Sequence, residues 1–342
     1  YVGLMSGTSL DGVDAVLADF SHSPWRLRHH VYRPYSEALR KQLLLLQHPN
    51  ENELHHAMLA ANELARCYAA VANELLAQAR AKPEQIVAIG CHGQTVRHNP
   101  QQGYSLQLCN AALLTELCGI SVVCDFRSRD IAAGGNGAPL VPAFHYALFP
   151  KRNTHRVIVN IGGISNLTNL PPKGTYFGFD CGPGNMLLDA WCETQTGQRF
   201  DVDGAWAASG RIIPELLKHL LTHPFFRQSP PKSCGREQFN LRWLNGFLSG
   251  KEASRDVQAT LLALTVQSIA QAVSEYCPGA EEIYLCGGGA RNKTLVEKLR
   301  QALPGIETDV TDALGINPQT LEAYAFAWLA WQTIQGKPGN LP

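Results

Sequence analysis

The first twenty residues, YVGLMSGTSLDGVDAVLADF, predict a β-hairpin whose turn is suited to holding a phosphate. Two apolar strand patterns flank a polar turn in which Gly7 and Gly12 let backbone N–H groups approach an anion without an intervening Cβ. Hydroxyl donors and carboxylates that can hold a counter-cation complete the turn: Thr8, Ser9, Asp11 and Asp14. Ordinary β-turns have a similar composition, so this hairpin alone leaves both interpretations open.

The same pattern returns at residues 157–170, where an apolar strand leads into Gly162 and Gly163 and apolar residues then resume. Aligned on the first hairpin, Gly163 falls on Gly7. A looser pair consists of IVAIGCHGQT at 86–95 and IYLCGGGARN at 283–292, which are both buried-strand patterns that end at glycine. Two matched pairs predict a duplicated architecture.

The composition indicates a globular protein that binds a small molecule. The chain has 342 residues, of which 45% are apolar and 17% charged, enough for a large core and two domains. Lys plus Arg and Asp plus Glu number 29 each, and no basic run favours nucleic acid. No apolar stretch predicts a membrane span and no leader pattern opens the chain, although we expect a few residues to precede Tyr1.

The 10 cysteines are scattered singly and without a CxxC pair, which predicts core thiols in a reducing compartment, the cytoplasm. Cys91 is next to His92, but adjacent side chains on a strand point to opposite faces, so we expect Cys91 to be structural.

Helices and strands alternate along the sequence, which predicts an α/β fold. A long helix is expected from a capping-box-like start at Asn50 and Glu53 to Leu75, and a short one, capped by Asn110, to Cys118. Pro183 is compatible with the first turn of a helix that runs through Trp191. The other expectations are strands at 86–91, 103–109, 121–126 and 283–286, an irregular binding loop at 128–143, an irregular region at 199–250, and helices at 255–276 and 318–334.

Common nucleotide signatures are missing, since the chain has no GxxxxGK[ST] and no strand-linked GxGxxG. Two glycine-turn hairpins and a third glycine turn at 287–289 are instead typical of actin-like ATPases and sugar kinases. The strings that narrow this pattern are, in order, GLMSGTSLDGVD, CHGQTVRH, RDIAAGGNGAPL, VNIGGISNLT, FDCGPGN and YLCGGGARN. Together they closely resemble the anhydro-N-acetylmuramic acid kinase family of bacterial cell-wall recycling.

The resemblance implies two actin-like, ribonuclease H-like domains that flank an ATP and substrate cleft, in a homodimeric enzyme. We expect residues 1–128 with about 322–342 in the first domain and 129–321 in the second. The implied reaction uses ATP, Mg²⁺ and water to convert 1,6-anhydro-N-acetylmuramic acid into N-acetylmuramic acid 6-phosphate. Mg²⁺ is expected because phosphoryl transfer requires the negative charge of the γ-phosphate to be neutralised, and Asp11 is the expected second-shell partner of the ion.

The resemblance also implies the ATP site. The expected contacts are Gly7, Thr8, Ser9, Leu10, Asp11, Gly12, Val13, Asp14, Asn160, Gly162, Gly163, Gly287, Gly288, Gly289 and Asn292.

Asp180 is the expected catalytic base, because it comes at the end of a strand pattern just before a glycine turn. One base can drive both halves of the reaction, since water attacks the anomeric carbon while O6 attacks the γ-phosphate. Asp also caps helices frequently, so from the residues alone both roles stay open, and the resemblance favours catalysis.

For the sugar, the expected contacts are His92, Gln94, Thr95, Arg127, Asp130, Asn185 and Glu322. An arginine suits the lactyl carboxylate of a muramic acid, although an ion pair of Arg127 with Asp125 or Asp130 is the alternative. Asn185 is equally compatible with a solvated helix start, and Glu322 with an exposed helix face.

Two other functions remain open at this point. Another sugar kinase of the same fold would use Asp180 to deprotonate a hydroxyl of a reducing sugar. An actin-like ATP-binding module would couple ATP to domain closure, but the chain has no obvious peptide-binding domain or polymerising insert.

Overall fold

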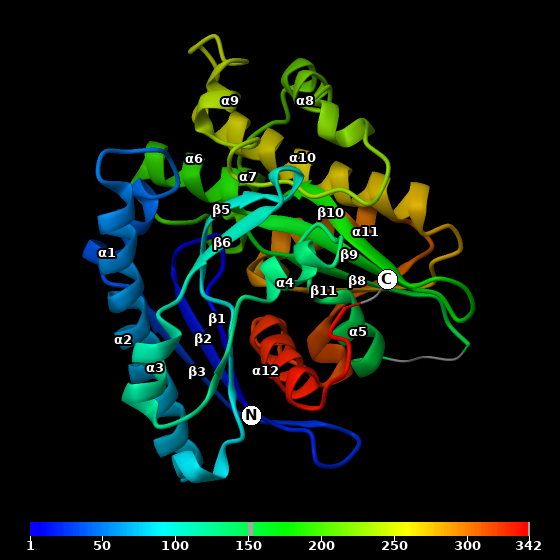
Figure 1. Ribbon diagram of the computed structural model, residues 1–342. Coiled ribbons are helices and arrows are strands. Elements are labelled where there is room, and N and C mark those ends of the chain that lie inside the picture. The colour runs from blue at the N-terminus through cyan, green and yellow to red at the C-terminus, as the bar shows by residue number, and fades with distance from the viewer. Residues whose placement is uncertain (150–152, 341–342) are drawn as a thin grey trace. The chain divides into compact units, whose positions relative to one another are not determined.

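The computed structural model describes residues 1–149 and 153–340, and the chain divides into two compact units (Figure 1). The first unit consists of Tyr1–Leu148 and Gln319–Pro342, and the second of Phe149–Pro318. The expected boundary was at 128/129, whereas residues 129–148 belong to the first unit here. The reason is packing within that unit, where the ring of Phe144 lies 5.2 Å from the ring of Tyr324.

The first unit is built on a five-stranded sheet in the order β3-β2-β1-β4-β7. The strands β1, β2 and β3 form an antiparallel meander, and β4 and β7 continue the sheet in parallel. A separate two-stranded sheet joins β5 and β6. The strands are β1 Val2–Met5, β2 Gly12–Asp19, β3 Arg26–Pro34, β4 Ile89–Cys91, β5 Gln94–Asn99, β6 Tyr104–Leu108 and β7 Val122–Val123.

Helices cover this sheet because their apolar side chains recur at helical spacing. In α2, Ala57, Leu64, Tyr68 and Leu75 are all buried. The helices of the first unit are α1 Glu37–Leu45, α2 Glu53–Ala79, α3 Ala111–Cys118, α4 Phe126–Ala132, α5 Pro142–Leu148 and α12 Leu321–Ile334.

The second unit repeats this arrangement with the sheet order β10-β9-β8-β11-β12. Again three antiparallel strands precede two parallel ones. The strands are β8 Arg156–Ile161, β9 Ile164–Leu170, β10 Phe177–Pro183, β11 Glu282–Cys286 and β12 Glu307–Val310. The helices are α6 Met186–Thr196, α7 Ala205–Ala208, α8 Pro214–Leu220, α9 Leu241–Asn245, α10 Ser254–Tyr276 and α11 Lys293–Ala302.

The two sheets therefore share one strand order, which confirms the predicted α/β class and duplication. This mixed order is that of the ribonuclease H-like domains of actin-like ATPases. The two glycine-turn hairpins are β1–β2 and β8–β9, and the looser pair of strand patterns became β4 and β11, which occupy the same place in each sheet.

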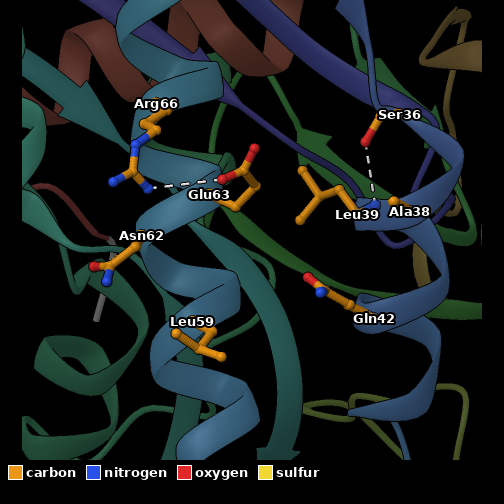
Figure 2. A pocket seen from close by; sticks show the side chains of 8 residues that line it. All are labelled: Ser36, Ala38, Leu39, Gln42, Leu59, Asn62, Glu63 and Arg66. Atoms are coloured by element: carbon orange, nitrogen blue, oxygen red, sulfur yellow. Dashed lines mark hydrogen bonds and ion pairs between the residues drawn. The ribbon is translucent and has the colours of Figure 1, made fainter.

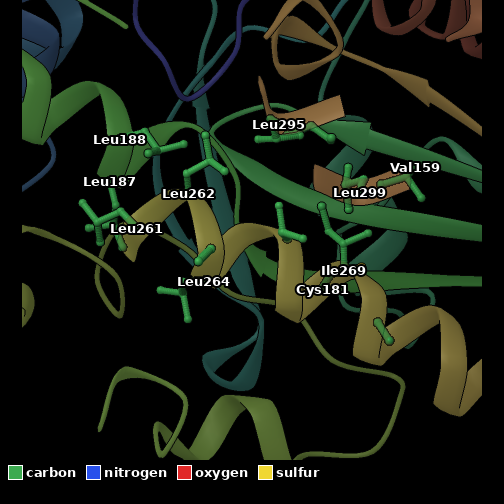
Figure 3. Close-up of a cluster of buried hydrophobic side chains, with 14 of the residues drawn as sticks. Val159, Cys181, Leu187, Leu188, Leu261, Leu262, Leu264, Ile269, Leu295 and Leu299 are labelled. Carbon is green, nitrogen blue, oxygen red and sulfur yellow. The ribbon is translucent and has the colours of Figure 1, made fainter. Parts of the chain in front are cut away.

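The core of the second unit forms between its sheet and α6, α10 and α11 (Figure 3). Within the described residues, α10 alone is long and apolar enough to cross a membrane, but 78% of its most apolar window is buried inside the unit. Such burial is that of a core helix.

Several local predictions were wrong. The α2 helix starts after Asn52, and Asn50 instead donates its side-chain amide to the carbonyl of Leu45. The strand expected at 121–126 covers only Val122–Val123, and α4 begins at Phe126. This helix runs to Ala132 and so extends into the segment 128–143, which was expected to be irregular.

Pro183 is the last residue of β10 and is not in a helix. It stays in the strand because β10 is an edge strand, where a missing N–H costs no ladder bond. The helix that follows begins at Met186.

Candidate functional site

The first glycine turn connects β1 and β2 and lies over a buried polar network. Within the turn, the Leu10 N–H donates to the Gly7 carbonyl at 3.3 Å, and Ser9 Oγ donates to Asp11 Oδ1 at 2.7 Å. A Cβ on Gly7 would meet nothing closer than Ser9 Oγ at 3.7 Å. Packing therefore does not require glycine at this position.

The network under the turn fixes its base. Ser6 Oγ donates to the Gly93 carbonyl at 2.9 Å and lies 2.7 Å from the Tyr68 hydroxyl. Gln94 Nε2 donates to the Gly7 carbonyl at 3.0 Å, and Tyr35 donates to Gln94 Oε1 at 3.2 Å. The fully buried Gln94 thus holds the turn from below.

His92 connects this turn to Arg127 on α4. Its Nδ1 lies 3.1 Å from the Ser6 carbonyl, and Arg127 Nε donates to His92 Nε2 at 3.0 Å. Burial, together with the positive charge of Arg127, lowers the pKa of His92 to about 3. The imidazole is therefore neutral, with Nδ1 as the donor to Ser6 and Nε2 as the acceptor from Arg127.

The segment AAGGNG, residues 132–137, is held in place by two charged residues of α4. Arg127 Nη1 donates to the Gly137 carbonyl at 2.6 Å, and the Gly137 N–H donates to Asp130 Oδ2 at 2.7 Å. Asn340 also donates to Asp130. Of the expected sugar contacts, His92, Arg127 and Asp130 thus come together in one network.

Further expected residues of the first unit lie on β2, β5 and α12. Thr95 is on β5, where its hydroxyl accepts from Gln107 at 3.2 Å, and Glu322 is in the first turn of α12. Gly12, Val13 and Asp14 belong to strand β2 and not to the turn. Asp14 pairs with His30 at 2.7 Å.

In the second unit, three segments gather at the end of β8. The N–H groups of Gly184 and Asn185 donate to the carbonyls of Gly163 and Gly162 at 2.9 and 2.8 Å. Asn185 Nδ2 donates to the Ile161 carbonyl at 3.2 Å. The start of α6 is thereby fastened to the second glycine turn.

The third glycine turn packs against the same strand end. Gly287 has a φ of +78°, and a Cβ there would lie 2.4 Å from Asn160 Oδ1. A Cβ on Gly289 would lie 2.4 Å from Ile161 Cγ2, whereas the nearest neighbour at Gly288 is Asn185 Nδ2 at 3.7 Å. Close packing therefore requires glycine at 287 and 289 but leaves room at 288.

Asn292 has a role in helix formation. Its Oδ1 accepts the Leu295 N–H at 3.0 Å, which makes it the N-cap of α11. Asn292 was expected to contact ATP, and the structure gives it this capping bond in addition.

Asp180 lies within β10 and is 4% exposed. Its Oδ2 accepts the N–H of Cys234 at 3.0 Å, and its own N–H donates to the carbonyl of Lys232 at 3.1 Å. The alternative role as a cap of α6 is wrong, since that helix starts at Asn185 and Met186. The contact with 232–234 was not predicted, because no motif marks a segment so distant in sequence.

A surface pocket of about 330 Å³ lies between α1 and α2 (Figure 2). Its edge carries the ion pair of Arg66 with Glu63 at 3.7 Å. None of the expected site residues lines it. The lining residues are Ser36, Ala38, Leu39, Gln42, Leu59, Asn62, Glu63 and Arg66.

Comparison with solved structures finds component A of the (R)-2-hydroxyglutaryl-CoA dehydratase of Acidaminococcus fermentans at a TM-score of 0.49 and 12% identity, over 96% of this chain and 98% of that one. Named relatives are far more similar in sequence. The anhydro-N-acetylmuramic acid kinase of Nitrosomonas europaea is 58% identical over 100% of this chain and 95% of its own length. That of Thiobacillus denitrificans is 54% identical over 100% of this chain and 92% of its own length. The model of the family described as anhydro-N-acetylmuramic acid kinase matches residues 1–342. The chain therefore belongs to the anhydro-N-acetylmuramic acid kinase family of ATP-dependent kinases.

Proposed function

We propose that this chain opens the 1,6-anhydro ring of 1,6-anhydro-N-acetylmuramic acid with water and phosphorylates O6, forming N-acetylmuramic acid 6-phosphate and ADP. The observation that carries the proposal is the full-length family match over residues 1–342. The reaction serves the recycling of cell-wall fragments.

Asp180 acts as the base in this proposal. It takes a proton from water as the water oxygen bonds to the anomeric carbon and the bond from that carbon to O6 breaks. O6 then bonds to the γ-phosphorus of ATP while the bond from that phosphorus to the β-phosphate oxygen breaks, so that ADP leaves. Its low exposure and its bond from the Cys234 N–H support this role, because a base must be held in one orientation.

Arg127 binds the lactyl carboxylate of the sugar. Support comes from its bonds to His92 and to the Gly137 carbonyl, which fix the guanidinium before the substrate arrives. The neutral imidazole of His92 adds no second positive charge beside it. The remaining sugar contacts are Gln94, Thr95, Asp130, Asn185 and Glu322, of which Gln94 acts by holding the first turn.

ATP is bound by the glycine turns. The open space around Gly7 and Gly288 supports close approach of a ligand to the backbone at these positions. Among the described residues, no three His, Cys, Asp or Glu side chains gather into a group that could hold a metal ion. In the proposal, Mg²⁺ is held mainly by phosphate oxygens and water with Asp11 as a second-shell partner, and the ion would supply charge neutralisation.

The experiment that tests the function is mass spectrometry of the products formed from the anhydrosugar, ATP and Mg²⁺ in ¹⁸O-labelled water. A sugar 6-phosphate with the label at its anomeric oxygen, analysed promptly because that position exchanges, is the expected result. Unmodified sugar with intact ATP would contradict the proposal and favour another sugar kinase. Loss of ATP without a sugar product would favour an ATP-binding module.

We propose further that the enzyme is a homodimer in the cytoplasm. The exposed apolar side chains of Leu54, Met58 and Leu59 on α2 support a contact with a second copy. All 10 cysteines are free thiols, which supports a reducing compartment. Light scattering during size-exclusion chromatography should give twice the mass of one chain, and a monomer would contradict the dimer.

A further inference from the structure

The segment 232–234 lies beside Asp180 at the edge of the second sheet, where Asp180, Lys232 and Cys234 are all buried. It accepts one hydrogen bond from the main chain of Asp180, at the Lys232 carbonyl, and donates one to its carboxylate, from the Cys234 N–H. Within the described residues, β10 is the edge strand, so no other strand of the sheet lies on this side. The Lys232 carbonyl thus accepts a main-chain bond that a neighbouring strand would otherwise accept, whereas the Cys234 N–H binds the side chain of Asp180.

Lys232 anchors the segment through a buried side chain. The residue is only 7% exposed, and its Nζ donates to the Phe225 carbonyl at 3.4 Å. The ammonium lies 4.8 Å from the ring centre of Phe225, 5.7 Å from that of Phe179 and 5.9 Å from that of Tyr276. A buried ammonium is costly, and aromatic faces offset part of that cost.

A side chain that served only to fill this space would be better apolar, because an aliphatic residue of similar length carries no desolvation cost. The charge therefore needs a reason, and the carboxylates of Glu275 and Asp180 are among the groups that act on it. Burial dominates and lowers the pKa of Lys232, while Cys181, Glu275, Cys234 and, by the smallest amount, Asp180 oppose that shift. The attraction is mutual, so the ammonium favours the ionised carboxylate.

We propose that Lys232 is a positioning residue for Asp180, which it serves by anchoring the Cys234 N–H against the carboxylate and by keeping a positive charge close to it. This inference rests on the proposed function, in which Asp180 is the base. A hydrogen bond to one carboxylate oxygen fixes the rotation of the group, so that proton transfer occurs in a constant direction. The bond and the ammonium both favour the charged form that accepts the proton.

Lys232→Met tests the proposal because it keeps most of the side-chain volume and removes the charge. We expect kcat to fall about 10²-fold, as when a reacting group is slightly misplaced, with the KM for ATP and sugar nearly unchanged. The acidic midpoint of the kcat–pH profile should move to higher pH, since the carboxylate loses stabilisation of its ionised form. Lys232→Arg, which retains the charge, should move that midpoint back toward the parent.

The matched control is Lys218→Met on α8, which removes an exposed lysine of the same unit and should leave both kinetics and pH profile unchanged. If Lys232→Met does not fold, Tyr276→Leu weakens the aromatic surround instead and should lower kcat several-fold with the same pH displacement. Parent kcat and parent pH profile in the folded variant would overturn the inference.

Asp180→Asn measured in parallel separates this inference from the function on which it rests. An inactive Asp180→Asn beside a fully active Lys232→Met would overturn only the role of Lys232. An active Asp180→Asn would overturn the proposed base.

Discussion

The two sheets have the same strand order but differ in the chemistry of one row of side chains. A row here is a set of three residues, one from each antiparallel strand, that lie opposite one another. The row in question is the second one from the glycine turn. In the first unit the row consists of Leu4, Ala15 and Val31, and in the second of Asn160, Asn166 and Asp180. The same row therefore belongs to the apolar core of the first unit, where it contributes to stability, whereas in the second unit it carries the proposed base.

The next row differs in size and not in polarity. Gly3 and Gly90 lie side by side in the first sheet, where a Cβ would come within 1.9 Å of the Ala323 carbonyl and 2.0 Å of the Phe326 carbonyl of α12. The matching positions of the second sheet hold Val159 and Leu285, which fill its core. Glycine in the first copy allows the helix backbone to lie directly on the sheet.

The polar row gives the largest expected effect. Asp180→Asn nearly preserves shape and removes the base, so kcat should fall about 10³-fold while the dissociation constants of ATP and sugar stay the same. Steady-state kinetics and calorimetric titration measure the two quantities.

The apolar row provides the matched control. Val31→Ala at the corresponding position removes two buried methyl groups and should lower the free energy of unfolding by about 2 kcal/mol, without a comparable loss of kcat. If Asp180→Asn turned over like the parent, or Val31→Ala abolished catalysis alone, the contrast between the rows would be incorrect.

The glycine row gives the next effect. Gly3→Ala adds a methyl group where α12 backbone lies, so it should lower the free energy of unfolding by about 3 kcal/mol. In the second unit the reverse change in size, Val159→Ala, should cost about 2 kcal/mol through lost burial. Urea unfolding measures both, and a neutral Gly3→Ala would mean that α12 can move away from the sheet.

The sequence predicts the strands and helices of the two units well, but it predicts poorly the contacts between segments that are far apart in the chain. Glycine turns between apolar strands identify both hairpins, and helical spacing identifies α2, α10 and α12, because these signals are local. The start of α6 was missed because Pro183 pairs with Ile164 in the edge ladder, a tertiary fact that overrides the helix preference. The bond from Cys234 to Asp180 joins segments far apart in the chain, and no pattern near either residue predicts it.

Acid should also distinguish the two units. His92 and His145 are both buried in the first unit, and burial lowers the pKa of each to about 3. Between about pH 6.5 and pH 3 the unfolded chain binds more protons than the folded unit, so stability falls as the pH drops through this range. At pH 5 each histidine should have lowered the free energy of unfolding by about 2 kcal/mol.

Hydrogen exchange at pH 7 and pH 5, corrected for intrinsic rates, measures this loss separately in peptides from α12 and α10. Protection should fall more in α12, and His145→Gln should reduce the difference. Equal losses in the two helices would contradict an acid-sensitive first unit.

The smallest effect concerns a feature that both units share. Asn110 caps α3 and Asn292 caps α11, each by accepting the N–H three residues on at 3.0 Å. Replacing either by Ala should cost about 1 kcal/mol of stability, and Asn292→Asp should cost little because Asp is an equally good cap. Asn110→Asp keeps the cap but loses the bond from Asn110 Nδ2 to Asn62 Oδ1, so it should cost more than Asn292→Asp. Thermal unfolding of the four variants measures this symmetry.

The KM for ATP then separates the two residues: if Asn292 also contacts the nucleotide, Asn292→Asp raises that KM although the cap is intact, whereas Asn110→Asp leaves it unchanged. An unchanged KM in both variants would limit Asn292 to its capping role and remove it from the proposed ATP site.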